Sequence, residues 1–262
     1  MSAVILEDEV VHYEVLGRGR PLIFVHGWLG SWRYWIPTMQ ALSLEFRTYA
    51  VDLWGFGDSG KRQERYSLEA QVSLLYGFME QLGILKAAFI GHGLGGAVVA
   101  RLARQHADLA DRLMAVSLPL TGAAISPRLV TPPLAGLVES LLGKGPAADP
   151  IGLEAAKTDI QAVEVSVRAM QEREPRLELN ELKPPCLLVY GEKDPVISAP
   201  GDDGLNGLTG NVHRIDLEES RHFPMLDEAS KFNRLLSDFL ALKSGEDLTD
   251  LGLKDEWRRR IR

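Results

Sequence analysis

Short apolar runs rich in β-branched residues alternate along this chain with longer stretches that carry apolar residues at helical spacing. This alternation is typical of a mostly parallel sheet covered by helices on both faces, because parallel strands need a crossover between them. Residues 22–25 are apolar without interruption, as in a strand that is buried on both faces. We therefore expect an α/β fold. The predicted strands are 10–15, 22–25, 47–53, 87–90, 113–118, 186–190 and 212–217, and the predicted helices are 67–82, 95–110 and 231–242.

Residues 119–185 interrupt this alternation, with two helical patches near 129–142 and 153–174 and no convincing strand. We expect residues 1–118 and 186–243 to form one α/β core and residues 119–185 to form a helical cap inserted into it. Residues 244–262 are a C-terminal tail that is acidic and then ends in a basic run, which we interpret as a solvated helical appendage.

Composition limits the classes of function. The 262 residues carry a net charge of −7 without a long basic run before the C-terminus, which argues against nucleic-acid binding. The single cysteine, Cys186, excludes an intrachain disulfide framework, and its place at a strand start predicts a core residue. The first ten residues do not resemble a secretory signal, and no run approaches the ~18 apolar residues that cross a bilayer. We expect a soluble, cytoplasmic protein whose partner is a small molecule.

A glycine-rich turn at residues 87–96 follows one predicted strand and opens a helix. Its glycines at 91, 93, 95 and 96 fit neither a Gly-x-Gly-x-x-Gly frame nor a P-loop, which also needs Lys-Ser/Thr. The spacing fits the nucleophile elbow Gly-x-Ser-x-Gly, in which small neighbours permit a strained turn. The turn therefore predicts an elbow of this kind between a strand and a helix.

Four further motifs in the same order make residues 10–242 similar to the α/β-hydrolase superfamily. The resemblance implies the α/β-hydrolase fold, with a mostly parallel sheet and a small helical cap, and a lineage of small-molecule carboxylic ester hydrolases. It also implies an oxyanion hole made by the backbone N–H groups of Trp28 and Leu94, a triad acid at Asp194 and a triad histidine at His222. The four motifs are His-Gly-Trp at 26–28, Asp-x-x-Gly-x-Gly-x-Ser at 52–59, Gly-Glu-Lys-Asp-Pro-Val at 191–196 and Ser-Arg-His-Phe-Pro at 220–224.

The chain departs from the family at the nucleophile, because Gly93 stands where the family has Ser, Asp or Cys. Glycine has no side chain, so no acyl-enzyme forms there, and the flanking His92 and Leu94 point elsewhere. Glycine also relieves the strain that a serine bears at an elbow, on the order of 1–3 kcal/mol. We expect the missing side chain to leave room beside His222 for a water molecule or a small ligand, on which a His222–Asp194 dyad acts as general base.

Each candidate has a structural alternative. His222 could be a packed loop histidine, and Asp194 before a proline could be a turn former. We expect Asp52 to stabilise its own turn, His26 to be structural and His12 to lie on the surface.

Trp28, Trp32, Trp35 and Trp54 lie on two loops beside the expected pocket mouth. Trp28, Trp32 and Trp54 are candidates for binding an apolar or aromatic ligand, and packing beneath the cap explains them equally well. No acidic cluster or histidine pair has metal-ligand spacing, so we expect neither a metal nor a cofactor. Residues 195–210, where the family has a helix, predict a loop.

Three functions remain open. Gly93 could replace the nucleophile of an ester hydrolase, the dyad could serve a non-covalent enzyme of the cofactor-free dioxygenase or lyase type, or the protein could bind a small ligand without catalysis. The sequence favours them in that order.

Overall fold

The computed structural model describes residues 2–242 except 132–133, 143–147, 173 and 209. Within these residues, eight strands form one sheet in the order β1-β2-β4-β3-β5-β6-β7-β8. The pairs β1–β2 and β2–β4 are antiparallel, and all the others are parallel. The strands are β1 Ser2–Leu6, β2 Glu9–Gly17, β3 Arg20–Val25, β4 Phe46–Val51, β5 Ala87–His92, β6 Ala110–Val116, β7 Cys186–Gly191 and β8 Val212–Leu217.

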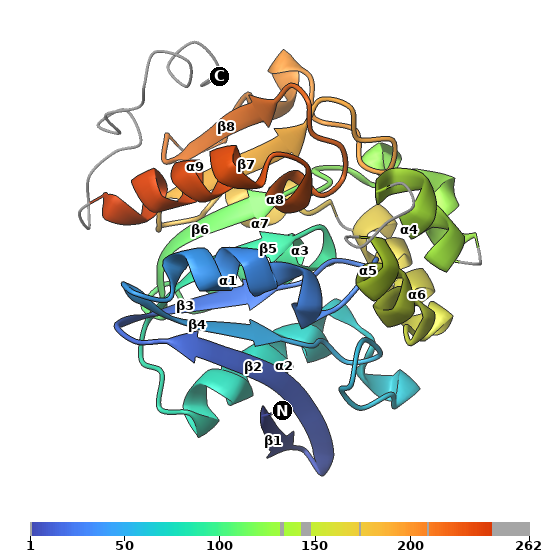
Figure 1. Ribbon diagram of the computed structural model, residues 1–262. Coiled ribbons are helices and arrows are strands. Elements are labelled where there is room, and N and C mark those ends of the chain that lie inside the picture. The colour runs from blue at the N-terminus through green and yellow to red at the C-terminus, as the bar shows by residue number, and fades with distance from the viewer. Residues whose placement is uncertain (1, 132–133, 143–147, 173, 209, 243–262) are drawn as a thin grey trace.

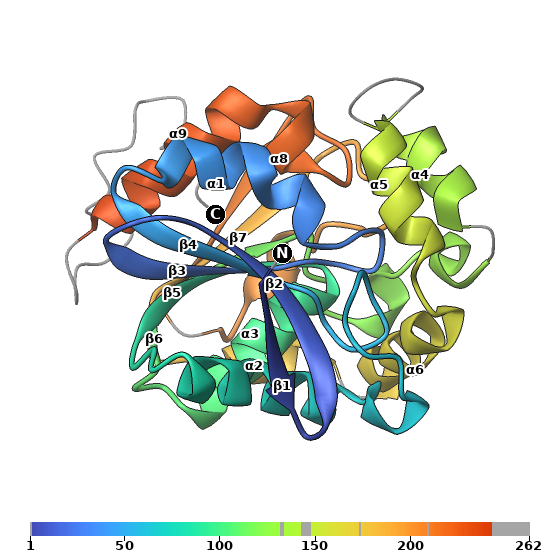
Figure 2. The same ribbon diagram turned by 60° about the horizontal axis from the view of Figure 1, so that its bottom comes forward.

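Helices cover both faces of this sheet. In Figures 1 and 2, α1 (Ile36–Leu42), α8 (Pro224–Asp227) and α9 (Ala229–Ala241) lie on one face, and α2 (Leu68–Gln81) and α3 (Leu94–Gln105) lie on the other. Every residue of β5 is buried, as expected for a central strand between two helical layers. Cys186 is also fully buried, which confirms that it belongs to the core. None of the described helices is long and apolar enough to cross a membrane.

The segment between β6 and β7 is helical, with α4 (Leu134–Leu142), α5 (Ala148–Ala156), α6 (Ile160–Glu172) and α7 (Arg176–Leu179). Figure 2 shows α4, α5 and α6 together at one end of the sheet. Hydrogen bonds join this group to the loops after the strands: Ser31 Oγ donates to Glu154, and the backbone N–H of Asp159 donates to the carbonyl of Gly55. The helices therefore lie over the carboxyl ends of the central strands.

Local features of the chain explain where the predicted elements were wrong. The predicted sheet lacked β1, which pairs with β2 through a tight turn in which Glu7 and Asp8 both have positive φ. That turn usually contains Asn-Gly or Asp-Gly, so its sequence did not signal a hairpin. Helix α1 was also missed.

Two predicted helices were too long. The helix predicted to reach residue 110 ends at Gln105, because His106 has φ −133°, outside the helical region. The patch at 153–174 divides between α5 and α6, because the Asp159 carboxylate accepts the N–H of Gln161 and starts a new helix. The described residues from 195 to 210 contain one short 3₁₀ turn, Asp202–Leu205, so the predicted loop is confirmed there. The predicted tail at 244–262 lies outside the described residues.

Candidate active site

The turn between β5 and α3 has the geometry that its glycines predicted. Gly93 has φ 49° and ψ −109°, a conformation that side-chain-bearing residues rarely adopt. A β-carbon on Gly91 would lie 2.4 Å from the carbonyl oxygen of Gly95, and one on Gly95 would lie 2.3 Å from that of Val25. Both positions therefore require glycine, and the turn is a sharp elbow at the carboxyl end of β5.

Trp28 borders the space next to Gly93. A β-carbon built on Gly93 would lie 3.0 Å from Cζ3 and 3.1 Å from Cε3 of the Trp28 indole. The indole is fully buried, and its Nε1–H donates to the Oγ of Ser166 in α6 at 2.9 Å. A side chain at position 93 would therefore require the ring to shift slightly. Room for a water molecule beside His222 remains a prediction.

Asp194 and His222 meet beside this elbow. Nδ1 of His222 lies 2.9 Å from Oδ2 of Asp194, and both side chains are almost completely buried. Oδ1 of Asp194 accepts the N–H groups of Val196 and Ile197 at 2.8 and 3.1 Å. Burial alone would raise the pKa of the Asp194 carboxyl, but His222 and these amides outweigh it and lower that pKa. The carboxylate thus remains charged and orients the imidazole.

The two ring nitrogens of His222 differ in their surroundings. Nε2 is buried and has no hydrogen-bond partner among the described residues. Because Asp194 takes the Nδ1–H, Nε2 carries the lone pair in the neutral ring. An unpaired buried acceptor is unfavourable in a folded protein, so this atom is suited to accept a hydrogen bond from a substrate or a water molecule.

The loop after β3 supplies N–H groups near the elbow. Nε2 of His26 accepts a hydrogen bond from the N–H of Leu53 at 3.0 Å, and Nδ1 lies 2.8 Å from the carbonyl oxygen of Gly27. Both ring nitrogens are therefore used in structural bonds, as expected. Burial lowers the pKa of His26, which stays neutral. The amides of Trp28 and Leu94 make no hydrogen bond within the part of the chain that the structure describes. The oxyanion hole expected at these two amides stays a prediction.

Sequence reasoning missed the role of His92. Its side chain does not replace a nucleophile, but its ring centroid lies 4.5 Å from that of His222, and Nε2 contacts the His222 carbonyl at 2.9 Å. Nδ1 lies 2.9 Å from the hydroxyl of Tyr34, which also accepts the N–H of Gly27 at 2.7 Å. A histidine at the end of an otherwise apolar strand was the available signal.

Comparisons with known proteins support the fold described above. Residues 20–141 match the family model for the alpha/beta hydrolase fold. The enol-lactonase of Burkholderia xenovorans LB400 superposes with a TM-score of 0.80 at 22% identity, covering 92% of this chain and 100% of the lactonase. The chain therefore has the α/β-hydrolase fold.

Its sequence relatives include esterases. The chain is 28% identical over 253 residues to the pimeloyl-acyl-carrier-protein methyl ester esterase of Vibrio cholerae, covering 87% of this chain and 97% of the esterase. A soluble epoxide hydrolase of Corynebacterium sp. is 36% identical over 103 residues, or 39% of this chain and 36% of that enzyme. The predicted α/β-hydrolase fold is confirmed, and the similarity to the Vibrio cholerae esterase extends along most of the chain.

Asp52 stabilises the turn that the superfamily motif predicts. Its carboxylate accepts the N–H groups of Trp32 and Asp58 at 2.8 and 3.1 Å, and it contacts Nδ1 of His12 at 2.9 Å. The prediction that His12 lies on the surface was wrong, since only 3% of it is exposed. His12 lies on β2 beneath the turn, and its backbone N–H donates a hydrogen bond to the Ser59 hydroxyl.

This turn also gathers three potential metal ligands that are distant in sequence. Side-chain atoms of His12, Asp52 and Asp58 lie within 4.8 Å of one another. The oxygens of Asp52 already accept N–H groups, and Asp58 pairs with Lys157 at 3.0 Å. The donors that surround these carboxylates favour a structural role for the cluster.

The tryptophans of this chain differ in their surroundings. Trp28, Trp35 and Trp54 are buried, and Trp32 is half-buried. The Arg33 guanidinium lies 4.8 Å from the Trp32 ring centroid, and the His12 ring lies 5.7 Å from it. Packing therefore accounts for the burial of most of them, and ligand binding by Trp28, Trp32 and Trp54 remains a prediction.

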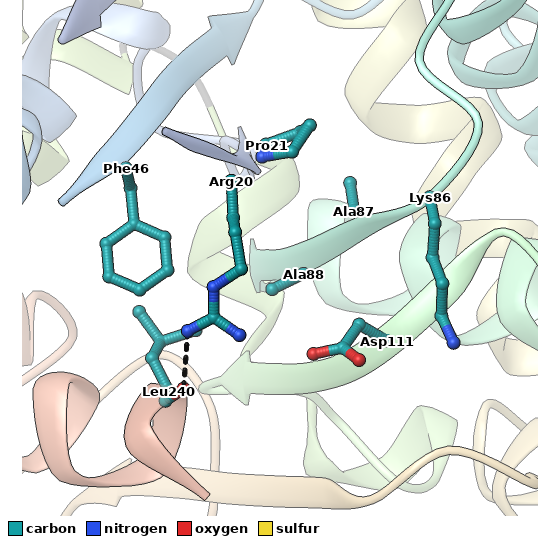
Figure 3. Close-up of a pocket in the computed structure, with 8 residues that line it drawn as sticks. All are labelled: Arg20, Pro21, Phe46, Lys86, Ala87, Ala88, Asp111 and Leu240. Atoms are coloured by element: carbon teal, nitrogen blue, oxygen red, sulfur yellow. Dashed lines mark hydrogen bonds between the residues drawn. The ribbon is translucent and has the colours of Figure 1, made fainter. Parts of the chain in front are cut away.

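The hollow in Figure 3 lies at the opposite end of the sheet from Gly93. It encloses about 160 Å³ and is lined by residues at the amino ends of parallel strands, including Arg20, Phe46 and Ala87, with Leu240 of α9 closing one side. Gly93 follows the carboxyl end of β5, where ligands of α/β sheets bind. A cleft of about 450 Å³ lies nearer the dyad, between residues 120–124 and the segment 198–204 that follows Asp194.

Proposed function

We propose that this protein is an ester hydrolase of the α/β-hydrolase superfamily in which His222, oriented by Asp194, acts as general base without a covalent acyl-enzyme. The observation that carries this proposal is the 2.9 Å contact between His222 and Asp194, which leaves a buried, unpaired Nε2 beside the elbow. The glycine at position 93 occupies the nucleophile position of the superfamily motif.

The proposed reaction uses water directly. Nε2 of His222 takes a proton from water as the water oxygen attacks the ester carbonyl carbon. The carbonyl oxygen becomes negative and accepts hydrogen bonds from the backbone N–H groups of Trp28 and Leu94. As the tetrahedral intermediate collapses, its bond to the alkoxide breaks and His222 returns the proton to the leaving oxygen. The products are a carboxylic acid and an alcohol, and the enzyme is unchanged.

The substrate class follows from the relatives and from the residues around the elbow. The Vibrio cholerae relative is a methyl ester esterase, and its similarity extends along most of this chain. Trp28 borders Gly93, which favours an apolar or aromatic group at the acyl side. We propose small carboxylic esters with apolar acyl chains as the substrates.

The inserted helices are proposed to form the cap over this site. Trp28 binds Ser166 of α6, and Ser31 binds the buried Glu154 of α5. The indole that borders Gly93 thus contacts α6, which supports residues 119–185 as a cap on a core of residues 1–118 and 186–243. Localisation in the cytoplasm stays a prediction.

Turnover of p-nitrophenyl acetate and butyrate tests the proposed function. We expect weak turnover by the parent chain that His222→Ala abolishes. Gly93→Ser should raise turnover by several orders of magnitude, again dependent on His222, because it adds the oxygen that the dyad would activate. If the parent chain shows no His222-dependent hydrolysis, the proposal is wrong, whatever Gly93→Ser gains.

A binding protein without catalysis is the second candidate, and the glycine at position 93, which supplies no nucleophile, favours it. It predicts that p-nitrophenyl butyrate binds without release of p-nitrophenol. Equilibrium binding of the unreactive ether analogue, measured beside the turnover assay, separates the two functions.

A further inference from the structure

A continuous hydrogen-bonded path runs behind the elbow from the oxyanion loop to the histidine loop. The N–H of Gly27 donates to the hydroxyl oxygen of Tyr34 at 2.7 Å. The hydroxyl lies 2.9 Å from Nδ1 of His92, and Nε2 of His92 lies 2.9 Å from the carbonyl oxygen of His222. Three segments thus meet in one buried chain of contacts: the connection after β3, the end of β5 and the loop after β8.

The partners determine every proton position along this path. A carbonyl oxygen only accepts, so Nε2 of His92 carries the proton that it donates to His222. Nδ1 of the neutral ring is then an acceptor, and the Tyr34 hydroxyl donates to it. The same hydroxyl oxygen accepts from Gly27, whose backbone N–H only donates. The direction Gly27 to Tyr34 to His92 to His222 is therefore the one consistent assignment.

Burial keeps both side chains of the path neutral. Only 3% of Tyr34 and none of His92 is exposed. Burial lowers the pKa of His92 well below its ordinary value, and the nearby His222 and His26 lower it further. The charge of Asp194 and the hydrogen bond to the His222 carbonyl raise this pKa, but their effect is smaller. Burial raises the pKa of the Tyr34 hydroxyl well above 10. Both side chains of the path therefore stay neutral near neutral pH.

We propose that His92 and Tyr34 are positioning residues that hold the oxyanion loop and His222 in one fixed geometry. The inference rests on the proposed function. Gly27 directly precedes Trp28, whose amide is the proposed oxyanion donor, and the bonded carbonyl belongs to the general base itself. A shift of the His92 ring therefore displaces the donor and the base relative to each other, and displacements of about 1 Å cost on the order of 10²-fold in rate.

The test uses variants that remove parts of the path. Tyr34→Phe leaves the Gly27 N–H and His92 Nδ1 unpaired. His92→Gln retains a donor for the His222 carbonyl, His92→Asn retains an acceptor for Tyr34, and His92→Leu retains neither. Tyr190→Phe is the matched control, because it removes a buried hydroxyl bond of 2.7 Å, to Leu118, that lies outside the path.

Two measurements are made on each variant. The first, on the parent Gly93 background, is hydrogen exchange of the Gly27 amide together with the NMR titration of His222. The second, on the Gly93→Ser background, is kcat and KM for p-nitrophenyl butyrate. We expect Tyr34→Phe and His92→Leu to speed Gly27 exchange at least about tenfold over the control and to lower kcat about 10- to 100-fold, with KM little changed. His92→Gln and His92→Asn should lie between these variants and the parent chain.

The two measurements separate this inference from the proposed function. If Gly93→Ser is inactive while Tyr34→Phe still alters Gly27 exchange and His222 titration, the proposed function fails and the path retains its positioning role. If Tyr34→Phe and the two conservative His92 variants fold and match Tyr190→Phe in both exchange and titration, the inference is overturned.

Discussion

Nδ1 of His222 lies 2.9 Å from Oδ2 of Asp194, although 28 residues separate them in the chain. Asp194 follows β7 and His222 follows β8, and these neighbouring parallel strands end at the same edge of the sheet. The two loops need only short connections to meet. The pairing is therefore a direct consequence of strand order, and it is the part of the site that the fold secures most firmly.

Replacing Gly93 by serine should not stabilise the fold. Serine at φ 49° carries backbone strain on the order of 1–3 kcal/mol, and its β-carbon also presses on the Trp28 ring. We expect a lower urea midpoint for Gly93→Ser than for the parent chain. A higher midpoint would contradict the strained-elbow explanation.

The same substitution should create a reactive nucleophile. Because Gly93 has no side chain, a serine-directed fluorophosphonate should not label the parent chain, whereas Gly93→Ser should be labelled once. Intact-mass spectrometry measures the stoichiometry, and Gly93→Ser with His222→Ala is the control for activation. Labelling of the parent chain would reveal a nucleophile elsewhere.

Asp194 should contribute to stability in a way that acid removes. Its pKa is lower in the folded state than the ordinary value near 3.9, because His222 and two backbone amides outweigh the effect of burial. The contribution is complete above about pH 4 and is lost as the pH falls through the folded pKa. Urea midpoints from pH 6 down to pH 3 should fall more steeply for the parent chain than for Asp194→Asn. The exposed Asp108→Asn serves as the control and should follow the parent chain.

His12 should have the opposite pH dependence. Burial alone would lower its pKa, but the hydrogen bond and charge of Asp52, with Asp58 and Glu14, raise it above the ordinary 6.5. The stabilisation is therefore complete below about pH 6.5 and is lost as the pH rises through the folded pKa. The loss of unfolding free energy in His12→Gln should be larger at pH 6 than at pH 9. Equal losses at both pH values, or a similar pH dependence in His106→Gln, would exclude this role.

The bond between Trp28 and Ser166 should link the cap to the core. Ser166→Ala leaves the buried indole N–H without its acceptor, which costs about 1–3 kcal/mol of unfolding free energy. Trp28→Phe removes that donor, so adding Ser166→Ala to it should have a smaller effect. A double-mutant cycle from urea unfolding measures this coupling, and additive effects would show that the bond contributes nothing.

Several parts of the site could be predicted because their signals are local. At positions 91 and 95 a neighbouring backbone oxygen lies within 2.4 Å of the point that a β-carbon would occupy, so the elbow is encoded in nearby glycines. Asp194 and His222 were identified from short motifs at strand ends. Residues whose roles depend on distant partners were misjudged: His12 was expected on the surface, and His92 was dismissed.

The sequence by itself determined the α/β-hydrolase fold, the place of the elbow at Gly93 and the candidate dyad residues as motif positions, because strand, turn and helix patterns depend on neighbouring residues. Only the tertiary structure decided that His12 lies beneath the Asp52 turn and that His92 joins Tyr34 to His222. The bonds of His92 connect residues 58 and 130 positions apart. Such contacts arise from the order in which strands assemble into the sheet, and no local pattern specifies which side chains then meet in the buried space between loops.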